Sequence, residues 1–139
     1  MKFPSIVADV MNNIISVDRS VTVAESAKIM TEKNIGSIIV TEEEKPVGII
    51  TKSDMLNRVI VAYKDPAVHK ARSIMSSSLI SVESDTPILE AMRFIHEKDI
   101  NQVLVSEGDE LVGIVSRGDL VEAVTLSSLT QFSSILGRK

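Results

Sequence analysis

The sequence predicts an α+β fold in which two copies of a β-α-β-β-α unit pack as a pseudo-two-fold pair. Residues 14–60 repeat at residues 79–125 without a gap, at a constant shift of 65, and 14 of the 47 pairs are identical. A repeat at a fixed period indicates an architecture built from one supersecondary unit. Each copy is too short to bury a good core by itself, so we expect the two copies to share one core.

The composition limits both the core and the class of protein. Hydrophobic residues make up 44% of the chain but aromatic residues only 3%, so aliphatic side chains must build the core. The net charge of −4 disfavours a nucleic-acid surface, which needs clustered Lys and Arg. The chain has no cysteine, no apolar run near the roughly 20 residues of a membrane span, and no signal-peptide core at its start. We therefore expect a cytoplasmic protein without a membrane segment.

The first copy contains the patterns of five elements. These are a strand at 14–17, a helix at 22–33, strands at 37–40 and 47–50, and a helix that follows Thr51 and carries Met55 to Ile60. Val23, Ala27 and Met30 lie at helical spacing, and Thr22 with Glu25 has the form of a capping box. The acidic run between the second and third strands is typical of a solvated hairpin loop.

The second copy repeats these patterns. They are a strand at 80–82, a helix capped by Thr86 with Pro87 in its first position, strands at 103–105 and 112–115, and a helix that follows Ser116. The connection covers 61–73, which divides the chain into a first repeat at 1–66 and a second at 67–139. The second repeat carries an extension, in which Leu126, Leu129, Phe132 and Leu136 predict an amphipathic helix and 137–139 is expected to fray.

The most specific local pattern is Gly-hydrophobic-hydrophobic-[Ser/Thr]-x-x-Asp, which occurs at Gly48–Asp54 and again at Gly113–Asp119. Two interpretations are open. In the first, each hydroxyl and each Asp only form a capping box at the start of a helix. In the second, the hydroxyl and the free amides bind a phosphate oxygen, and the Asp accepts hydrogen bonds from ribose hydroxyls. Recurrence of the pattern in both copies favours the second interpretation.

The duplicated unit closing with Gly-Ile-Ile-Thr-Lys-Ser-Asp and Gly-Ile-Val-Ser-Arg-Gly-Asp resembles a pair of CBS domains, the Bateman module named from cystathionine β-synthase. The openings Val10-Met11 and Ile74-Met75 also resemble this family, and the resemblance covers about residues 7–126. It implies a regulatory fold that requires no cofactor. It also implies a regulatory ligand of the adenosine type, either an adenine nucleotide (AMP, ADP or ATP) or S-adenosylmethionine.

The resemblance further implies two sites, one at each motif, with walls from both copies. One site would use Ile114, Ser116, Asp119, Asn101 and Gln102, together with Ile15, Ile35, Gly36 and Ser37. The other would use Ile49, Thr51 and Asp54, together with Ile80, Ile100, Asn101 and Gln102. Gly36, Ser37 and Gln102 supply no positive charge for a phosphate. That charge falls on Lys52 and Arg117, with linker residues such as Lys70 and Arg72 as further candidates. Gly118 leaves room for close backbone approach, which favours the site of Asp119.

Other functions have less support in the sequence. No base–nucleophile pair indicates catalysis, and His69 and His96 do not form a metal-site pattern. We expect a regulatory module that is not an enzyme. It would act on an unidentified enzyme or transporter, or through a homodimer formed by the apolar helix faces at 55–60 and 120–124. The alternative is a ligand-independent interaction or dimerisation module. A nucleic-acid-binding regulator is a third reading, which the acidic balance disfavours.

Overall fold

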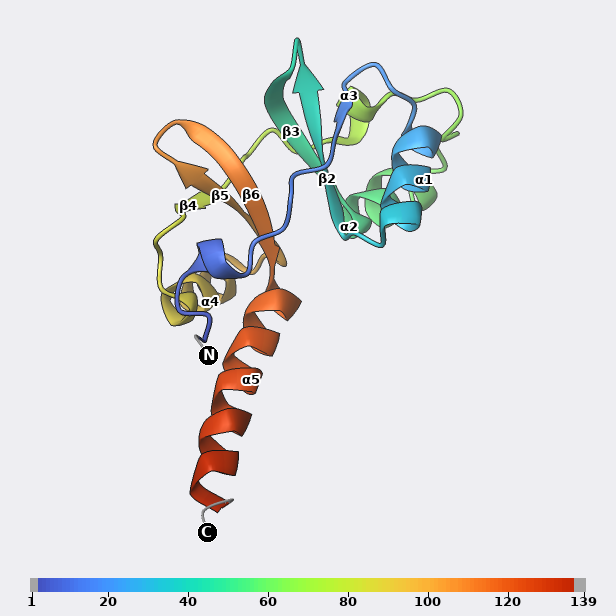
Figure 1. Ribbon diagram of the computed structural model, residues 1–139. Coiled ribbons are helices and arrows are strands. Elements are labelled where there is room, and N and C mark those ends of the chain that lie inside the picture. The colour runs from blue at the N-terminus through green and yellow to red at the C-terminus, as the bar shows by residue number, and fades with distance from the viewer. Residues whose placement is uncertain (1–2, 137–139) are drawn as a thin grey trace. The chain divides into compact units, whose positions relative to one another are not determined.

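The computed structural model describes residues 3–136 of the chain, with side chains described as far as Ser128. Each repeat has the predicted β-α-β-β-α order and forms one three-stranded sheet (Figure 1). The predicted α+β fold with two repeats is therefore confirmed.

The first repeat contains β1 (Ser16–Asp18), α1 (Val23–Lys33), β2 (Ser37–Glu42), β3 (Lys45–Thr51), α2 (Lys52–Met55) and η2 (Leu56–Ile60). β1 runs parallel to β2, and β2 runs antiparallel to β3. The Thr22 hydroxyl caps α1, because it accepts a hydrogen bond from the Glu25 N–H at 3.1 Å. Val23 and Met30 of α1 are buried, as their spacing predicted.

The second repeat contains β4 (Ser81–Glu83), α4 (Ile88–Lys98), β5 (Gln102–Glu107), β6 (Glu110–Ser116) and α5 (Arg117–Leu136). Pro87, and not Thr86, is the N-cap of α4. The Pro87 carbonyl accepts the first helical hydrogen bond, from the Ala91 N–H at 3.0 Å. Pro87 thus takes the position that Thr22 has in the first repeat.

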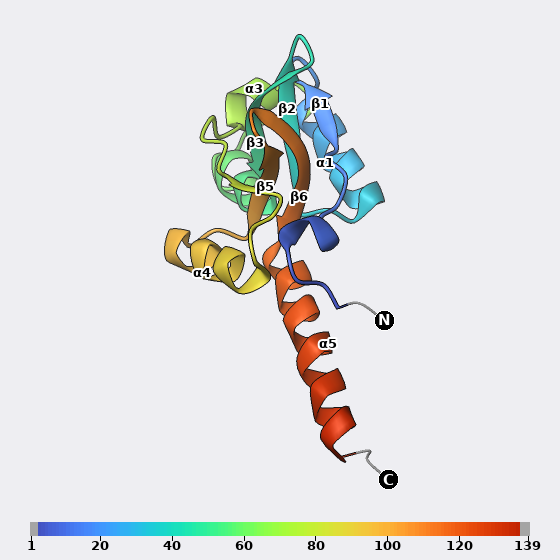
Figure 2. The same cartoon turned by 60° about the vertical axis from the view of Figure 1, so that its left-hand side comes forward.

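The helix α5 confirms the predicted helical extension, since it continues well beyond the sheet of its own unit (Figures 1 and 2). The side chains of Leu129, Phe132 and Leu136 lie outside the described ones. The expected fraying of 137–139 concerns residues that lie outside the described part of the chain.

Packing divides the chain differently from the sequence repeat. One compact unit contains Met1–Asn13 and Ile80–Lys139, and the other contains Ile14–Leu79. Each repeat is therefore completed by the segment that precedes the other repeat. We call residues 3–13 and 67–79 the lead-in segments.

The two lead-in segments make matching contacts. In the unit of the second repeat, the backbones of Asn12 and Ile114 exchange two hydrogen bonds of 2.8 and 3.0 Å. In the unit of the first repeat, Ser76 and Ile49 exchange two of 2.9 Å each. Asn12 and Ser76 are 64 positions apart, close to the shift of the main repeat. Each lead-in segment also contains a short helix, η1 (Val7–Asp9) in one and α3 (Ala71–Ile74) in the other.

The lead-in segments contribute to the buried apolar core of each unit. Most of the buried apolar side chains form two clusters, each within one unit, whereas Ile39 and Leu104 are buried but belong to neither cluster. One contains Val17, Val23, Met30, Ile38, Val40, Ile50 and Val59 with Ala71 and Ile74 of the lead-in segment. The other contains Ile88, Ala91, Ile95, Val103, Val105, Val115, Leu120 and Ala123 with Val7. Each lead-in segment thus supplies buried apolar groups to its own unit, and the expectation of one core shared by the two copies stays a prediction.

Gly48 and Gly113 permit the close approach of the lead-in segments. A Cβ atom on Gly48 would lie 2.9 Å from the backbone oxygen of Ser76, and one on Gly113 would lie 2.6 Å from the Met11 sulfur. Real Cβ contacts of this length do not occur, so a side chain at Gly48 would displace the backbone of the lead-in segment, and one at Gly113 would displace the Met11 side chain. Packing therefore explains the glycine that opens each motif.

Candidate ligand-binding site

In the unit of the first repeat, the motif lies where β3 ends and α2 begins. The Thr51 hydroxyl accepts a hydrogen bond from the Asp54 N–H at 3.2 Å, and the Asp54 Oδ2 accepts one from the Thr51 N–H at 2.8 Å. These reciprocal bonds form a complete capping box. The capping-box interpretation of this motif is thus confirmed. The capping box uses Oδ2 of Asp54 and leaves Oδ1 to other partners.

Arg58, which the sequence analysis missed, takes the second oxygen of Asp54. Its Nε lies 3.6 Å from Asp54 Oδ1, and the two side chains are 48% and 15% exposed, respectively. The Arg58 Nη1 also donates to the carbonyl oxygens of Ile74 and Met75, at 3.0 Å each. The available signal was the spacing, because Asp and Arg four residues apart face each other on a helix.

In the unit of the second repeat, the same motif lies between β6 and α5. The Ser116 hydroxyl accepts from the Asp119 N–H at 3.0 Å, and Asp119 Oδ2 accepts from the Ser116 N–H at 3.1 Å. Asp119 Oδ2 accepts a further bond from the Asn12 side-chain amide at 2.9 Å. No local sequence signal indicates Asn12, because it lies 107 residues from Asp119.

The backbone brings further predicted residues beside each motif. In the first unit, Ser37 lies opposite Thr51 in the β2–β3 register, and the Gly36 carbonyl accepts from the Lys52 N–H at 3.1 Å. Ile15 contacts β2 through its carbonyl, which accepts from the Ile39 N–H at 3.0 Å. Ile35 and Ile49 of the same unit are half-buried.

The second unit has an equivalent arrangement. Gln102 lies opposite Ser116 in the β5–β6 register, and the Asn101 carbonyl accepts from the Arg117 N–H at 2.8 Å. The Ile80 carbonyl accepts from the Leu104 N–H at 3.0 Å. Ile100 and Ile114 are half-buried. The combination of walls from both repeats into one site stays a prediction.

The two basic residues of the motifs differ in their freedom. Lys52 is exposed. Arg117 is half-buried, and its Nη2 donates to the Ile100 carbonyl at 2.9 Å. A phosphate would therefore meet a free ammonium group at the first motif. At the second motif it would meet a guanidinium that already has a backbone partner.

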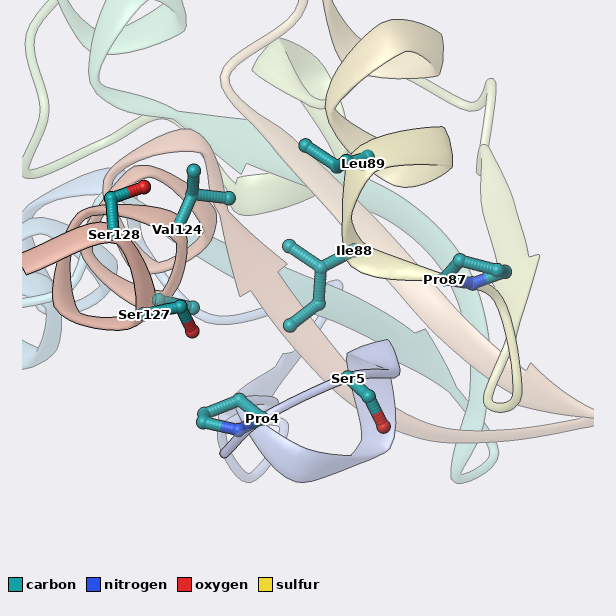
Figure 3. Close-up of a pocket in the computed structure, with 9 residues that line it drawn as sticks. Pro4, Ser5, Pro87, Ile88, Leu89, Val124, Ser127 and Ser128 are labelled. Carbon is teal, nitrogen blue, oxygen red and sulfur yellow. The ribbon is translucent and has the colours of Figure 1, made fainter. Parts of the chain in front are cut away.

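A pocket of about 340 Å³ lies in the unit of the second repeat, where the first lead-in segment meets α4 and α5. Figure 3 shows Ile88 and Val124 among its apolar lining, with the Ser127 and Ser128 hydroxyls at one side. No residue from Ser116 to Asp119 lines this pocket. It is therefore separate from the motif of its own unit.

Two classes of feature are absent from the described part of the chain. Among these residues, no group of three or more His, Asp or Glu side chains is placed to hold a metal ion. None of the described helices combines the length and apolarity that crossing a membrane requires.

Comparisons with known proteins agree with the duplicated fold. The family model described as CBS domain matches residues 7–61 and again 71–126. An uncharacterized protein of Methanopyrus kandleri is 36% identical over 112 residues, which are 79% of this chain and 57% of that protein. This chain thus spans about half the length of such curated relatives.

Two solved structures extend these matches to the fold. A conserved protein from Pyrococcus horikoshii has a TM-score of 0.81 at 32% identity, and the match covers 89% of this chain and 95% of that one. A hexameric CBS-CP12 protein from bloom-forming cyanobacteria has a TM-score of 0.75 at 28% identity, and the match covers 84% of this chain and 66% of that one. The resemblance drawn from the sequence motifs is confirmed.

Proposed function

Because this chain belongs to the CBS-domain family, with two copies of the domain, we propose that it is a regulatory module that binds an adenosyl ligand at its Ser/Thr-x-x-Asp turns. The ligand is an adenine nucleotide or S-adenosylmethionine. Binding changes the state of an oligomer or of a partner, such as an enzyme or a transporter. The compartment that we propose is the cytoplasm.

The observation that carries this proposal is the geometry of the two carboxylates. Asp54 and Asp119 each stand one turn into a helix, beside a hydroxyl and a sheet edge, and each uses Oδ2 for the capping box. A carboxylate oxygen has two acceptor positions. At Asp119, ribose hydroxyls can therefore bind at Oδ1 without loss of the helix cap, whereas at Asp54 they would meet Arg58 at that oxygen. A phosphate can approach the start of either helix.

Regulation in this proposal rests on differential affinity. A ligand shifts a conformational equilibrium only by the difference in its affinity for the two states. An adenosyl compound that binds one arrangement of the module more tightly therefore favours that arrangement. The cyanobacterial relative is described as hexameric, which supports an oligomer as the receiver of such a signal.

Self-association is the second part of the proposal. In η2, Leu56 and Ile60 are 60% and 65% exposed, and Val121 of α5 is 45% exposed. These residues lie on the two helices whose apolar faces the sequence analysis assigned to a homodimer. Contiguous exposed apolar patches are typical of an interface, and Leu56 and Ile60 are four residues apart on one helix, which places them on one face. We propose that these faces join two copies of the chain.

A second candidate is a ligand-independent interaction module. The specific observation in its favour is that both capping boxes are complete, so each motif has a structural role without any ligand. The two candidates differ in what they predict for added adenosyl compounds.

A thermal-shift series with AMP, ADP, ATP, S-adenosylmethionine and NAD tests the first candidate. A ligand present at about 100 times its Kd adds about 2.7 kcal/mol to the free energy of unfolding, which raises the Tm measurably. We expect at least one compound of the series to do so, with guanosine nucleotides as the matched control. If no adenosyl compound raises the Tm, the first candidate fails and the ligand-independent interaction module is the remaining candidate.

A further inference from the structure

The two motifs have the same capping-box geometry but different additional partners. In each, the hydroxyl caps the helix and one carboxylate oxygen accepts a backbone N–H. The difference lies in the second group that reaches each carboxylate. It is a cation at Asp54 and a neutral amide at Asp119.

At Asp54, the cation stands at the oxygen that a ligand would need. The Arg58 Nε lies 3.6 Å from Oδ1, while the capping box occupies Oδ2. The two carbonyl bonds of Arg58 Nη1, at 3.0 Å each, hold the guanidinium in this place. The contact with Asp54 is an ion pair and not a hydrogen bond, so its own contribution is small. The two carbonyl bonds are what keep the guanidinium beside Oδ1, and ribose hydroxyls would have to displace it from there.

At Asp119, the additional partner binds the oxygen that is already used. The Asn12 amide and the Ser116 N–H both donate to Oδ2. The ion pairs of the described residues are Arg19–Glu42 and Arg58–Asp54, so Asp119 has no basic partner among them. The position equivalent to Arg58 is Ala123, which is 4% exposed and cannot supply a charge.

We propose that the two sites are not equivalent: the ribose diol of an adenosyl ligand binds Asp119, while Arg58 closes Asp54 to it. Asn12 is a positioning residue, which holds the Asp119 carboxylate with Oδ1 directed away from the cap. This inference rests on the proposed function and narrows it to one ligand per chain. Gly118 fits this assignment. A Cβ atom there would meet only the Ser116 hydroxyl, at 3.7 Å, so the absence of a side chain leaves space beside Asp119 for a ligand.

Calorimetric titration of the full chain with the tightest binder of the five adenosyl compounds tests Arg58. We expect one ligand per chain for the wild type and two for Arg58→Ala, with a return to one when Asp54→Ala is added. Arg93→Ala, which removes another exposed arginine, serves as the control and should still bind one ligand per chain. A wild-type chain that binds two ligands, or an Arg58→Ala chain that binds one or fewer, overturns the inference.

The same titration tests the role of Asn12. The readout is the preference for the ligand over an analogue without ribose hydroxyls, which a purely structural role of Asn12 would not change. Asn12→Ala should weaken binding by about 2- to 10-fold, the range of one net hydrogen bond. It should also reduce the preference for the ligand over its 2′,3′-dideoxy analogue, whereas Asn13→Ala should change neither quantity. An unchanged preference in Asn12→Ala overturns its positioning role. If none of the five compounds binds the wild type, the proposed function itself fails.

Discussion

At the scale of single residues, the glycines of the two motifs have different tasks. Gly48 lies under the second lead-in segment, and a side chain there would meet the backbone of Ser76. Gly118 is exposed at the first turn of α5 and has ordinary space for a Cβ atom. Packing therefore requires a glycine at position 48. At position 118, no neighbouring atom of the described residues would exclude a side chain.

Substitution of these glycines by alanine separates the two cases. Gly48→Ala should lower the free energy of unfolding by about 1–3 kcal/mol, because it overpacks a close contact. Gly118→Ala is the matched control and should raise it by about 0.4–1 kcal/mol, because it restricts the unfolded chain. Chemical denaturation measures both values. Equal effects of the two substitutions would contradict the packing argument.

The sequence predicted the motif residues better than their additional partners. Thr51, Ser116 and the two aspartates were found because hydroxyl and acid at this spacing form a local pattern, and the capping boxes are present. Arg58 and Asn12 were not found. Arg58 acts through a tertiary contact with the lead-in carbonyls, and Asn12 comes from a distant segment whose place depends on the whole fold.

At the scale of elements, the lead-in segments decide how each repeat closes its core. The predicted boundary at 66/67 follows the sequence repeat, whereas packing exchanges the lead-in segments between the two repeats. Apolar periodicity could predict the helices and strands because it is local. It could not predict the exchange, since a short segment such as 3–13 carries no information about which sheet it joins.

Two fragments of equal length test the exchange. Residues 14–79 contain a repeat with the lead-in segment that packs on it, whereas 1–66 contain the same repeat with the other one. We expect 14–79 to unfold cooperatively and 1–66 to lack a cooperative transition, because Ala71 and Ile74 of the core are missing from it. Circular dichroism during thermal unfolding measures this difference. A cooperative transition in 1–66 alone would contradict the exchange.

Glu83 links β4 to the hairpin of β5 and β6. Its carboxylate accepts from the Ser106 hydroxyl at 2.7 Å and from the Gly108 N–H at 3.2 Å. These hydrogen bonds, the Ser106 bond first, hold the pKa of Glu83 below its ordinary value of 4.5. The folded chain therefore releases this proton more easily than the unfolded chain. The stabilisation is present above the ordinary pKa and is lost as the pH falls through the lower one.

We expect Glu83→Gln to reduce this acid-dependent part of the stability. Its free energy of unfolding should be lower than that of the wild type near about pH 7, and the difference should shrink towards about pH 3. Glu107→Gln, which changes an exposed glutamate of β5, is the matched control and should follow the wild type. Urea denaturation across this pH range measures the effect. If the difference in unfolding free energy between the wild type and Glu83→Gln grew on acidification, the Glu83 carboxylate would not stabilise the folded chain in the way described.

At the scale of the whole molecule, we propose a duplicated module that passes its ligand state to an oligomer or a partner. Its apolar groups are distributed accordingly, because Val59 and Leu120 are buried in their own units while Leu56, Ile60 and Val121 are exposed. The same helices therefore close a core with one face and present an apolar surface with the other.

Charge substitution on the exposed face tests self-association. We expect the wild type to sediment as a dimer or a larger oligomer at micromolar concentration, and Leu56→Glu with Ile60→Glu to sediment as a monomer. Leu89→Glu, on α4 and 68% exposed, is the matched control and should leave the assembly unchanged. Analytical ultracentrifugation gives the masses. A monomeric wild type would rule out the proposed interface.

The most direct test of the central claim, that the Ser/Thr-x-x-Asp turns bind an adenosyl ligand, is the affinity of the double variant Asp54→Ala, Asp119→Ala. The loss of charge-assisted hydrogen bonds to ribose should cost about 1.5–3 kcal/mol of binding, which is about a 10- to 100-fold rise in Kd. The unfolding free energy of the same variant is measured in parallel. An unchanged Kd, with stability lowered by about 1 kcal/mol per lost cap, would show that the motifs are only capping boxes.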